Sequence, residues 1–285
     1  MAENRRGLVA FVLGGGGVLG AREVGMLKAL EEAGVRPGLI LGTSVGALNG
    51  VFVAADPDAA VSQLADVWRD RAAGETFGGS LFGRVATLAR SGTHLHSGAP
   101  LRRLLTEMLP VERIEELAVP FQCVAASIER AAAHWFTSGP IVPAVLASTA
   151  VPGLLPPVRV GDEHYLDGGL VHSIPVGRAV ALGATTVYVL HVGRIERPLT
   201  VPTRPWQVGL VAFEIARRHR FAEDMASLPA GVTVHVLPAG VDGQPGADLS
   251  QLRYRDFSRI DEHIQRAYEA SAAYLEAAPG HQAAG

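Results

Sequence analysis

Two side chains in this sequence have the right types and settings for nucleophilic chemistry, and the first is Ser44. It lies in the stretch "GTSVG", between Gly42 and Gly46, after a strand-like apolar run and before a helix-like run. Glycines on both sides of a serine allow a sharp turn that lifts the hydroxyl out of a sheet at a helix N-terminus. The pattern therefore predicts a nucleophilic serine.

A serine hydroxyl hardly ionises near neutral pH, so Ser44 needs a general base. The better candidate is Asp167, which ends a strand-like run and is followed by Gly168 and Gly169, so that the backbone can aim the carboxylate. A plain Asp-Gly turn is the alternative interpretation. The histidines offer no clear base, since they stand in strand-like runs, in an irregular section or in the tail: His94, His96, His134, His191 and His281.

A third motif, the glycine run in "LVAFVLGGGGVLGA", predicts a site for negative charge. A strand, a glycine turn and a helix N-terminus together present backbone N–H groups to an anion. Residues 15–20, "GGGVLG", also satisfy the dinucleotide pattern G-x-G-x-x-G, but that pattern needs an acidic residue after the second strand, where Gly-Thr-Ser stands. We therefore expect the amides of Gly15, Gly16 and Gly17 to bind the oxyanion that forms when Ser44 attacks an acyl carbonyl.

The elements that must position these motifs alternate between strand and helix, which is typical of a parallel sheet covered on both faces. Apolar period and punctuation predict strands at 7–13, 38–44, 120–129, 132–139, 185–192 and 232–239. Helices are predicted at 21–34, 45–55, 57–70, 99–109, 177–182, 206–228 and 254–277. The first two strands would bring both glycine turns to the same edge of the sheet.

Bulk properties exclude several classes. The 285-residue chain has a formal net charge of −3, which argues against nucleic-acid binding, and its single cysteine, Cys123, excludes internal disulfides and suits a buried core position. Two stretches without charged residues, 38–55 and 131–158, carry the glycines and prolines of buried structure instead of a membrane span. The arginine-flanked start breaks into glycines, unlike a signal peptide. We expect a cytoplasmic protein with at most peripheral membrane contact.

In their order, "GGGGVLG", "GTSVG" and "DGG" resemble the motifs of the patatin-like phospholipase family. The resemblance runs from Leu8 to about Pro175 and includes "ASTAVPGLLPPVRV". It implies an α/β fold of three layers, α/β/α, with a mainly parallel central sheet, and a Ser-Asp dyad that cleaves lipid or other acyl esters without metal or cofactor. Ser44 would be the nucleophile and Asp167 the base. The motif glycines carried over are Gly15, Gly16, Gly17, Gly20, Gly42, Gly46, Gly168 and Gly169.

The sequence departs from the family pattern in places. Leu19 stands where the family commonly has Arg or Lys, with Arg22 nearby, and Ser173 stands where the family often has Asn. After Val192 no family motif is found. We expect one domain at 7–278, with a lid or insertion around 72–100 and a flexible tail at 279–285.

Within the helix predicted at 206–228, a basic cluster invites two interpretations. Its residues are Arg217, Arg218, His219 and Arg220. They could contact anionic lipid head groups, but the interpretation we favour is a solvated helix face.

Two other functions stay open at this point. A catalytically idle family member could act as an interaction protein, and a nucleotide-dependent oxidoreductase could use the loop from Gly15 to Gly20. An idle relative would be free to lose Ser44 or Asp167, and this chain has both. The sequence therefore favours a hydrolase.

Overall fold

The strands form one mixed sheet whose centre is parallel. The computed structural model describes residues 7–73, 96–192, 198–240 and 259–278, and within them the sheet has the order β5-β6-β3-β2-β1-β7-β8, with β4 paired to β3. The adjacent strands β3, β2, β1, β7 and β8 run parallel to one another. Strands β4 and β6 pair antiparallel with β3, and β5 pairs antiparallel with β6. The strands are β1 (Leu8–Leu13), β2 (Leu39–Thr43), β3 (Phe121–Ser127), β4 (Ala132–Phe136), β5 (Val158–Val160), β6 (Glu163–Asp167), β7 (Ala184–Leu190) and β8 (Thr233–Val236).

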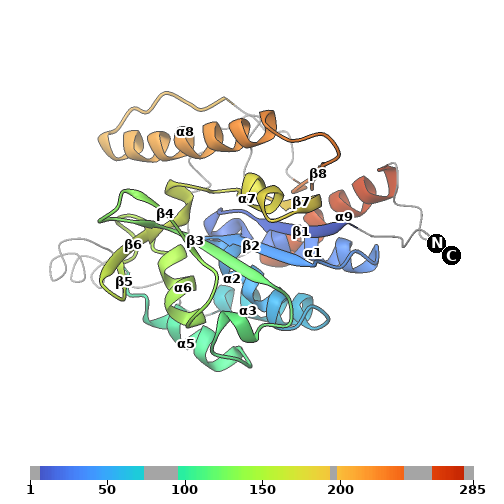
Figure 1. The fold of residues 1–285 in the computed structure, drawn as a ribbon, viewed down its shortest axis with the longest axis horizontal. Coiled ribbons are helices and arrows are strands. Elements are labelled where there is room, and N and C mark those ends of the chain that lie inside the picture. The colour runs from blue at the N-terminus through green and yellow to red at the C-terminus, as the bar shows by residue number, and fades with distance from the viewer. Residues whose placement is uncertain (1–6, 74–95, 193–197, 241–258, 279–285) are drawn as a thin grey trace.

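Helices cover both faces of this sheet, which confirms the three-layer α/β/α prediction (Figure 1). One face carries α7 (Val176–Ala181) and α8 (Pro205–Ala226). The other carries α1 (Ala21–Glu32), α2 (Val45–Ala55), α3 (Ala60–Ala73), α5 (Ala99–Met108), α6 (Ile141–Ser148) and α9 (Ile260–Ala277). Short 3₁₀ turns are η1 (Gly17–Gly20), η2 (Ile114–Glu116) and η3 (Gly168–Leu170).

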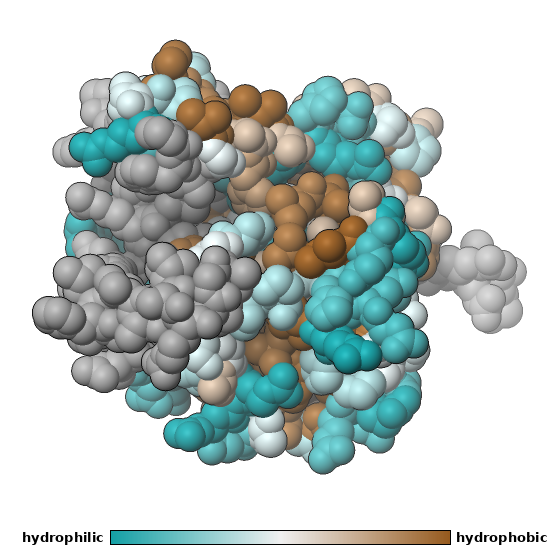
Figure 2. Space-filling model, turned by 90° about the vertical axis from the view of Figure 1, so that its left-hand side faces the viewer, coloured by the Kyte–Doolittle hydropathy of each residue, from teal (hydrophilic) through white to brown (hydrophobic). Residues whose placement is uncertain are grey.

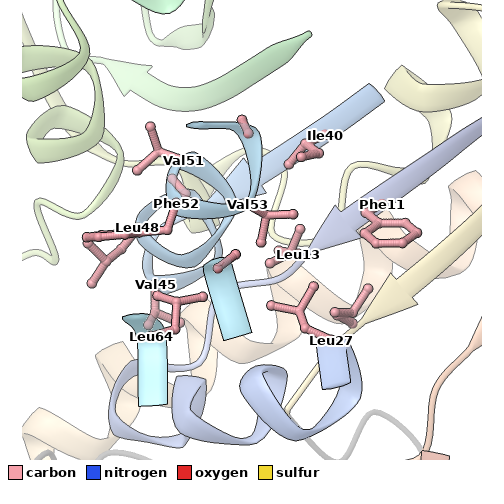
Figure 3. Packing of buried hydrophobic residues seen from close by; sticks show 14 of the residues in the cluster. Phe11, Leu13, Leu27, Ile40, Val45, Leu48, Val51, Phe52, Val53 and Leu64 are labelled. Carbon is pink, nitrogen blue, oxygen red and sulfur yellow. The ribbon is translucent and has the colours of Figure 1, made fainter. Parts of the chain in front are cut away.

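Alternation along the central strands explains why two separate cores form. In β1, Phe11 and Leu13 join the larger core, whereas Ala10 and Val12 join the smaller one under α7 and α8. Successive side chains of a strand point to opposite faces, so a strand buried on both faces must be apolar throughout. Figure 3 shows the larger core, where side chains of β1 and β2 meet those of α1, α2 and α3. Cys123 is fully buried there, as predicted.

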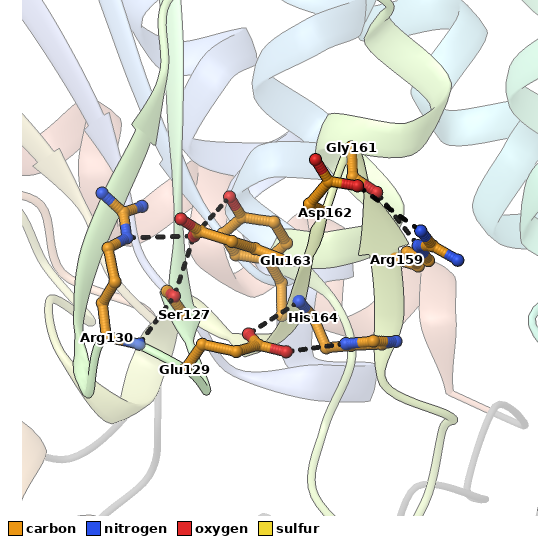
Figure 4. Close-up of polar contacts among 9 residues, drawn as sticks. Ser127, Glu129, Arg130, Arg159, Gly161, Asp162, Glu163 and His164 are labelled. Carbon is orange, nitrogen blue, oxygen red and sulfur yellow. Dashed lines mark hydrogen bonds and ion pairs between the residues drawn. The ribbon is translucent and has the colours of Figure 1, made fainter.

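The antiparallel edge places Asp167. Strand β6 pairs with β3 so that Asp167 lies opposite Ala125. Polar contacts hold this edge together, as Figure 4 shows: Glu163 accepts hydrogen bonds from Ser127 (2.9 Å) and Arg130 (2.9 Å). At the next residue of β6, the backbone N–H and the ring of His164 form hydrogen bonds with the Glu129 carboxylate. These bonds lower the pKa of Glu129 to about 2. Exposed pairs contribute little individually, and the register of β6 is given by its backbone pairing with β3.

The predicted elements are present, apart from small shifts of their ends, and two were missed. The sequence analysis placed no helix at Ile141–Ser148 and no strand at Val158–Val160. Prolines do not prevent the helix, because Pro140 caps α6 and Pro143 lies in its first turn, where a missing N–H costs nothing. The predicted lid at 72–100, the tail at 279–285 and the start of the last helix fall mostly outside the described residues.

No helix within the described ranges is long and apolar enough to cross a membrane. The last described helix, α9, packs along α1 on the larger core. Gly25 of α1 makes this possible, because a Cβ there would lie 2.1 Å from the Ile264 carbonyl oxygen and 2.7 Å from the Tyr268 nitrogen of α9. The C-terminal helix is thereby fastened to the N-terminal one.

We expect Gly25→Ala to destabilise the protein by about 1–3 kcal/mol, because the new methyl must displace backbone atoms of α9. The matched control is Gly209→Ala in α8, where a Cβ would meet nothing within 4 Å. That change should stabilise by up to about 1 kcal/mol, since alanine is the better helix former. Urea unfolding measures both, and equal stabilities for the two variants would contradict this account of α1–α9 packing.

Candidate active site

The turn at Ser44 is built by two glycines that leave no room for side chains. A Cβ on Gly42 would lie 2.5 Å from the Cα of Ala47, and one on Gly46 would lie 2.2 Å from the Leu13 carbonyl oxygen. Between them, Ser44 has φ 56° and ψ −124°, in the left-handed half of the backbone map. Such a conformation costs a non-glycine residue about 1–3 kcal/mol and is concentrated at functional sites. The predicted sharp turn is therefore present and strained.

Several groups hold Ser44 in this turn. Its backbone N–H donates to the Ser148 hydroxyl at 3.0 Å, and its carbonyl accepts from Ala47 and Leu48 in the first turn of α2. Ser44 is the N-cap of α2, where the helix dipole favours negative charge. Ser148 was missed by the sequence analysis because α6 itself was missed. The position of a serine at the end of an apolar helix would have been the signal.

Asp167 lies at the end of β6, and its side chain is buried. Its Oδ1 accepts from the Gly169 N–H at 2.7 Å, whereas Oδ2 has no partner of full hydrogen-bond geometry among the described residues. Burial raises the pKa of Asp167 to about 6, while a hydrogen bond from Ser44, the Gly169 N–H and the positive charge of Arg217 act in the opposite direction. The structure thus brings together the two side chains that the sequence singled out.

The glycine-rich loop runs past Ser44. A Cβ on Gly15 would lie 3.5 Å from the Ser44 Cβ and 3.5 Å from the Ser173 hydroxyl. The Gly15 N–H donates to the Ser173 carbonyl at 3.2 Å, so in this conformation it serves the loop itself. Gly17 has φ 59° and needs to be glycine. Within the described residues, the amides of Gly16 and Gly17 donate to no backbone carbonyl, which leaves them as the candidate oxyanion donors.

A buried polar network supports the far end of this loop. The Asn49 amide donates to the Gly20 carbonyl (2.9 Å) and to Glu23 Oε2 (2.8 Å), and the Trp68 indole donates to Asn49 Oδ1 (3.1 Å). Glu23 is fully buried, and burial raises its pKa well above the ordinary value. The raised pKa favours the neutral form of Glu23, which avoids an uncompensated buried charge. The network ties three helices, α1, α2 and α3, to the loop, and no sequence pattern indicated it.

Arg217 corrects one sequence prediction. The basic cluster of α8 was interpreted as a solvated face, which is wrong for Arg217: its side chain is 5% exposed, against 50% for Arg220. Its Nη1 donates to the Gly15 carbonyl at 2.8 Å. The interpretation suits Arg220 and the more exposed His219.

The arrangement supplies a serine at a helix N-terminus, a buried carboxylate with a pKa near neutrality, and backbone amides beside them. These groups suit attack on an acyl carbonyl with a carboxylate as base. The acidic residue that a dinucleotide site needs is absent from the end of β2, where Thr43 donates to the His172 carbonyl. In the part of the chain that the structure describes, no cluster of three His, Cys, Asp or Glu side chains could hold a metal.

The chain matches the family model "Patatin-like phospholipase" over residues 11–180. It is 32% identical over 189 residues to lysophospholipase nte1 of Emericella nidulans, covering 66% of this chain and 12% of that protein. It is 34% identical over 188 residues to human patatin-like phospholipase domain-containing protein 6, covering 65% of this chain and 13% of that protein. The chain thus corresponds to a small part of these relatives.

A similar solved structure is that of VipD from Legionella pneumophila, with a TM-score of 0.45 and 14% identity over 95% of this chain and 67% of that one. Another is the acyltransferase domain of an iterative polyketide synthase in enediyne biosynthesis, with a TM-score of 0.33 and 18% identity over 95% of this chain and 74% of that one.

The reactivity of Ser44 should depend on pH through Asp167. Its pKa of about 6 means that the carboxylate is protonated in acid and cannot accept the serine proton. The rate of covalent modification by a fluorophosphonate should therefore rise with pH through a midpoint near 6 and level off above it. Mass spectrometry of the Ser44 peptide across a pH series measures this. A midpoint near 4 would show that burial does not control the base.

The strained turn predicts opposite effects on stability and reactivity. Ser44→Gly should stabilise the protein relative to Ser44→Ala by about 1 kcal/mol or more, because only glycine adopts a positive φ freely. Both variants lose the hydroxyl and should be unreactive. Urea unfolding of the pair isolates the strain, since neither retains the Ser44 side-chain hydrogen bond. Equal stabilities would mean that the turn stores no strain.

Proposed function

Because this chain belongs to the patatin-like phospholipase family, we propose that it is a serine acyl hydrolase that cleaves carboxylic esters of lipids. The observation that carries the proposal is the pairing of a strained Ser44 with a buried Asp167 whose Oδ2 is available. A carboxylate with a pKa near the working pH is a more effective proton acceptor than an ordinary aspartate.

In the proposed reaction, Ser44 Oγ attacks the ester carbonyl as its proton passes to Asp167 Oδ2. The carbonyl oxygen becomes an oxyanion, which accepts hydrogen bonds from the amides of Gly16 and Gly17. The tetrahedral intermediate then collapses, and the leaving alcohol takes the proton from Asp167. Water attacks the resulting acyl-enzyme with Asp167 again as base, releasing the fatty acid and restoring Ser44. No metal or cofactor takes part in these steps.

Apolar surface near the dyad supports a lipid substrate. Leu170, three residues after Asp167, is 37% exposed, and the ring of Phe213 in α8 lies against Gly169. Figure 2 shows hydrophobic residues gathered in a band down one face of the molecule, with hydrophilic residues along its right-hand side. Val208 and Ile215, on α8, are also more than half exposed. An acyl chain suits such surface, and we include peripheral contact with a lipid layer in the proposal.

We also propose that residues 7–278 act as one domain. The packing of α9 on α1 and of α8 on the sheet supports this, since segments after the last family motif contribute to both cores. The region after Val192 then completes the site, because α8 brings Arg217 and Phe213 to it.

The proposal is tested by comparing wild type, Ser44→Ala, Asp167→Asn and a matched control, Asp162→Asn. Asp162 is a fully exposed carboxylate in the β5–β6 turn, so its loss should leave activity unchanged. We expect hydrolysis of lysophospholipid or p-nitrophenyl acyl esters to vanish in Ser44→Ala and to fall at least about 10²-fold in Asp167→Asn. Fluorophosphonate should label wild type on the Ser44 peptide.

The outcomes separate the alternatives. Labelling of Ser44, together with loss of hydrolysis in Asp167→Asn but not in Asp162→Asn, would establish the dyad, and the ester class that is hydrolysed would name the substrate class. No labelling and no hydrolysis, while a control serine hydrolase reacts, would instead favour the idle interaction protein. Full activity in Asp167→Asn would remove the aspartate from the mechanism and leave the base unassigned.

A further inference from the structure

Arg217 is a buried cation that the proposed reaction does not yet use. It comes from α8, 202 residues after Gly15 in the chain, and its Nη1 donates to the Gly15 carbonyl at 2.8 Å. Glu214, one turn earlier on α8, lies 3.3 Å from its Nε and is itself only 15% exposed. Burying a guanidinium is costly unless it is paired and bonded in this way. The contact with Gly15 is therefore a built feature of the fold.

The peptide that Arg217 holds is the one that carries a candidate oxyanion donor. The carbonyl of Gly15 and the N–H of Gly16 belong to one planar peptide unit and point in opposite directions when the bond is trans. Fixing the carbonyl toward α8 therefore fixes the Gly16 N–H on the other side. A hydrogen bond from a charged donor also polarises the peptide, which makes the Gly16 N–H a stronger donor.

The glycine-rich loop, residues 14–20, has no cationic side chain of its own that could hold the Gly15 carbonyl. Residues 14–20 contain no charged side chain, and Leu19 packs against the larger core. The Gly15 N–H is held by the Ser173 carbonyl, and the Gly20 carbonyl is held by Asn49. The Gly14 N–H is held by the Leu190 carbonyl, and the Gly15 carbonyl is a further point at which the loop is held from outside, in this case by α8.

We propose that Arg217 is a positioning residue that orients the Gly16 amide toward the oxyanion by holding the Gly15 carbonyl. This role rests on the proposed acyl hydrolase function for its catalytic consequence, but not for its structural one. A second consequence concerns the base: the same guanidinium lowers the pKa of Asp167 and so opposes the effect of burial.

The pH dependence of the reaction is expected to report the pKa of Asp167, which depends on the groups that face Asp167 and Arg217. Asp167 faces the Ser44 hydroxyl, the Gly169 N–H of η3 and Arg217 of α8. Arg217 faces Glu214 on its own helix and the buried His191 after β7. Burial and the neighbouring arginines lower the pKa of His191 well below the ordinary value, which favours its uncharged form.

The test compares Arg217→Met and Arg217→Lys with Arg220→Met, which removes the same charge from an exposed position on the same helix. On a soluble p-nitrophenyl ester, we expect Arg217→Met to lower kcat by about 10-fold or more with little change in KM, since a misaimed donor weakens transition-state binding. The acid limb of its pH profile should move to higher pH. Arg217→Lys should keep the acid limb in place but still lose kcat, because an ammonium cannot reproduce the guanidinium contact.

Two further readouts need no turnover. Amide hydrogen exchange of the 14–20 peptide should be faster in Arg217→Met and Arg217→Lys than in wild type. The Asp167 carboxyl pKa, measured by ¹³C NMR, should rise in Arg217→Met alone. If wild type hydrolyses no ester, the proposed function fails, while these two readouts still decide whether Arg217 orders the loop.

The proposal is overturned if Arg217→Met matches Arg220→Met in kcat, loop exchange and Asp167 pKa. Should Arg217→Met fail to fold, Arg217→Lys carries the test by itself: wild-type kcat and loop exchange in that variant would equally exclude the positioning role.

Discussion

The structure depends on one close approach, that of the end of β1 to the start of α2. Gly46 sits against the Leu13 carbonyl so tightly that a Cβ would lie 2.2 Å from it. This contact sets the turn at Ser44 directly beside the loop that leaves β1. Because the two strands are parallel neighbours, their ends share an edge, and the proposed nucleophile Ser44 meets the candidate oxyanion donors there. The strain at Ser44 follows from the same geometry.

The other half of the site comes from a different kind of pairing. Strand β6 runs antiparallel to β3, and its last residue, Asp167, pairs with Ala125 in the C-terminal half of β3. The register of this pairing brings Asp167 to the edge of the sheet where the parallel strands end. Its backbone N–H donates to the Ala150 carbonyl after α6, and α6 also supplies the Ser148 hydroxyl to Ser44. The segment between β4 and β6 therefore positions both members of the proposed dyad, although it carries neither.

Local signals explain what could be predicted from the sequence. The strand, turn and helix at Ser44 lie within a few residues of one another, so apolar period and glycines sufficed for that part of the fold, and the Asp167 motif was equally local. Ser148 and Arg217 were beyond reach for different reasons. Pro140 and Pro143 obscured the helical pattern of α6 in the sequence, although the first turn of a helix tolerates proline. For Arg217, helical spacing could not tell which face of α8 is buried, because the partner is a backbone carbonyl 202 residues away.

The electrostatics of the site reflect a balance that a histidine-based triad does not need. A buried carboxylate without compensation would stay protonated and could not act as a base, whereas a fully solvated one would be too weak an acceptor. Asp167 lies between these limits: burial raises its pKa to about 6, and Ser44, the Gly169 amide and Arg217 hold it there. Two of those three groups also belong to the proposed reacting region, Ser44 as the proposed nucleophile and Arg217 through its hydrogen bond to Gly15. The loop geometry and the strength of the base are therefore coupled through α8, a helix that lies beyond the family's sequence motifs.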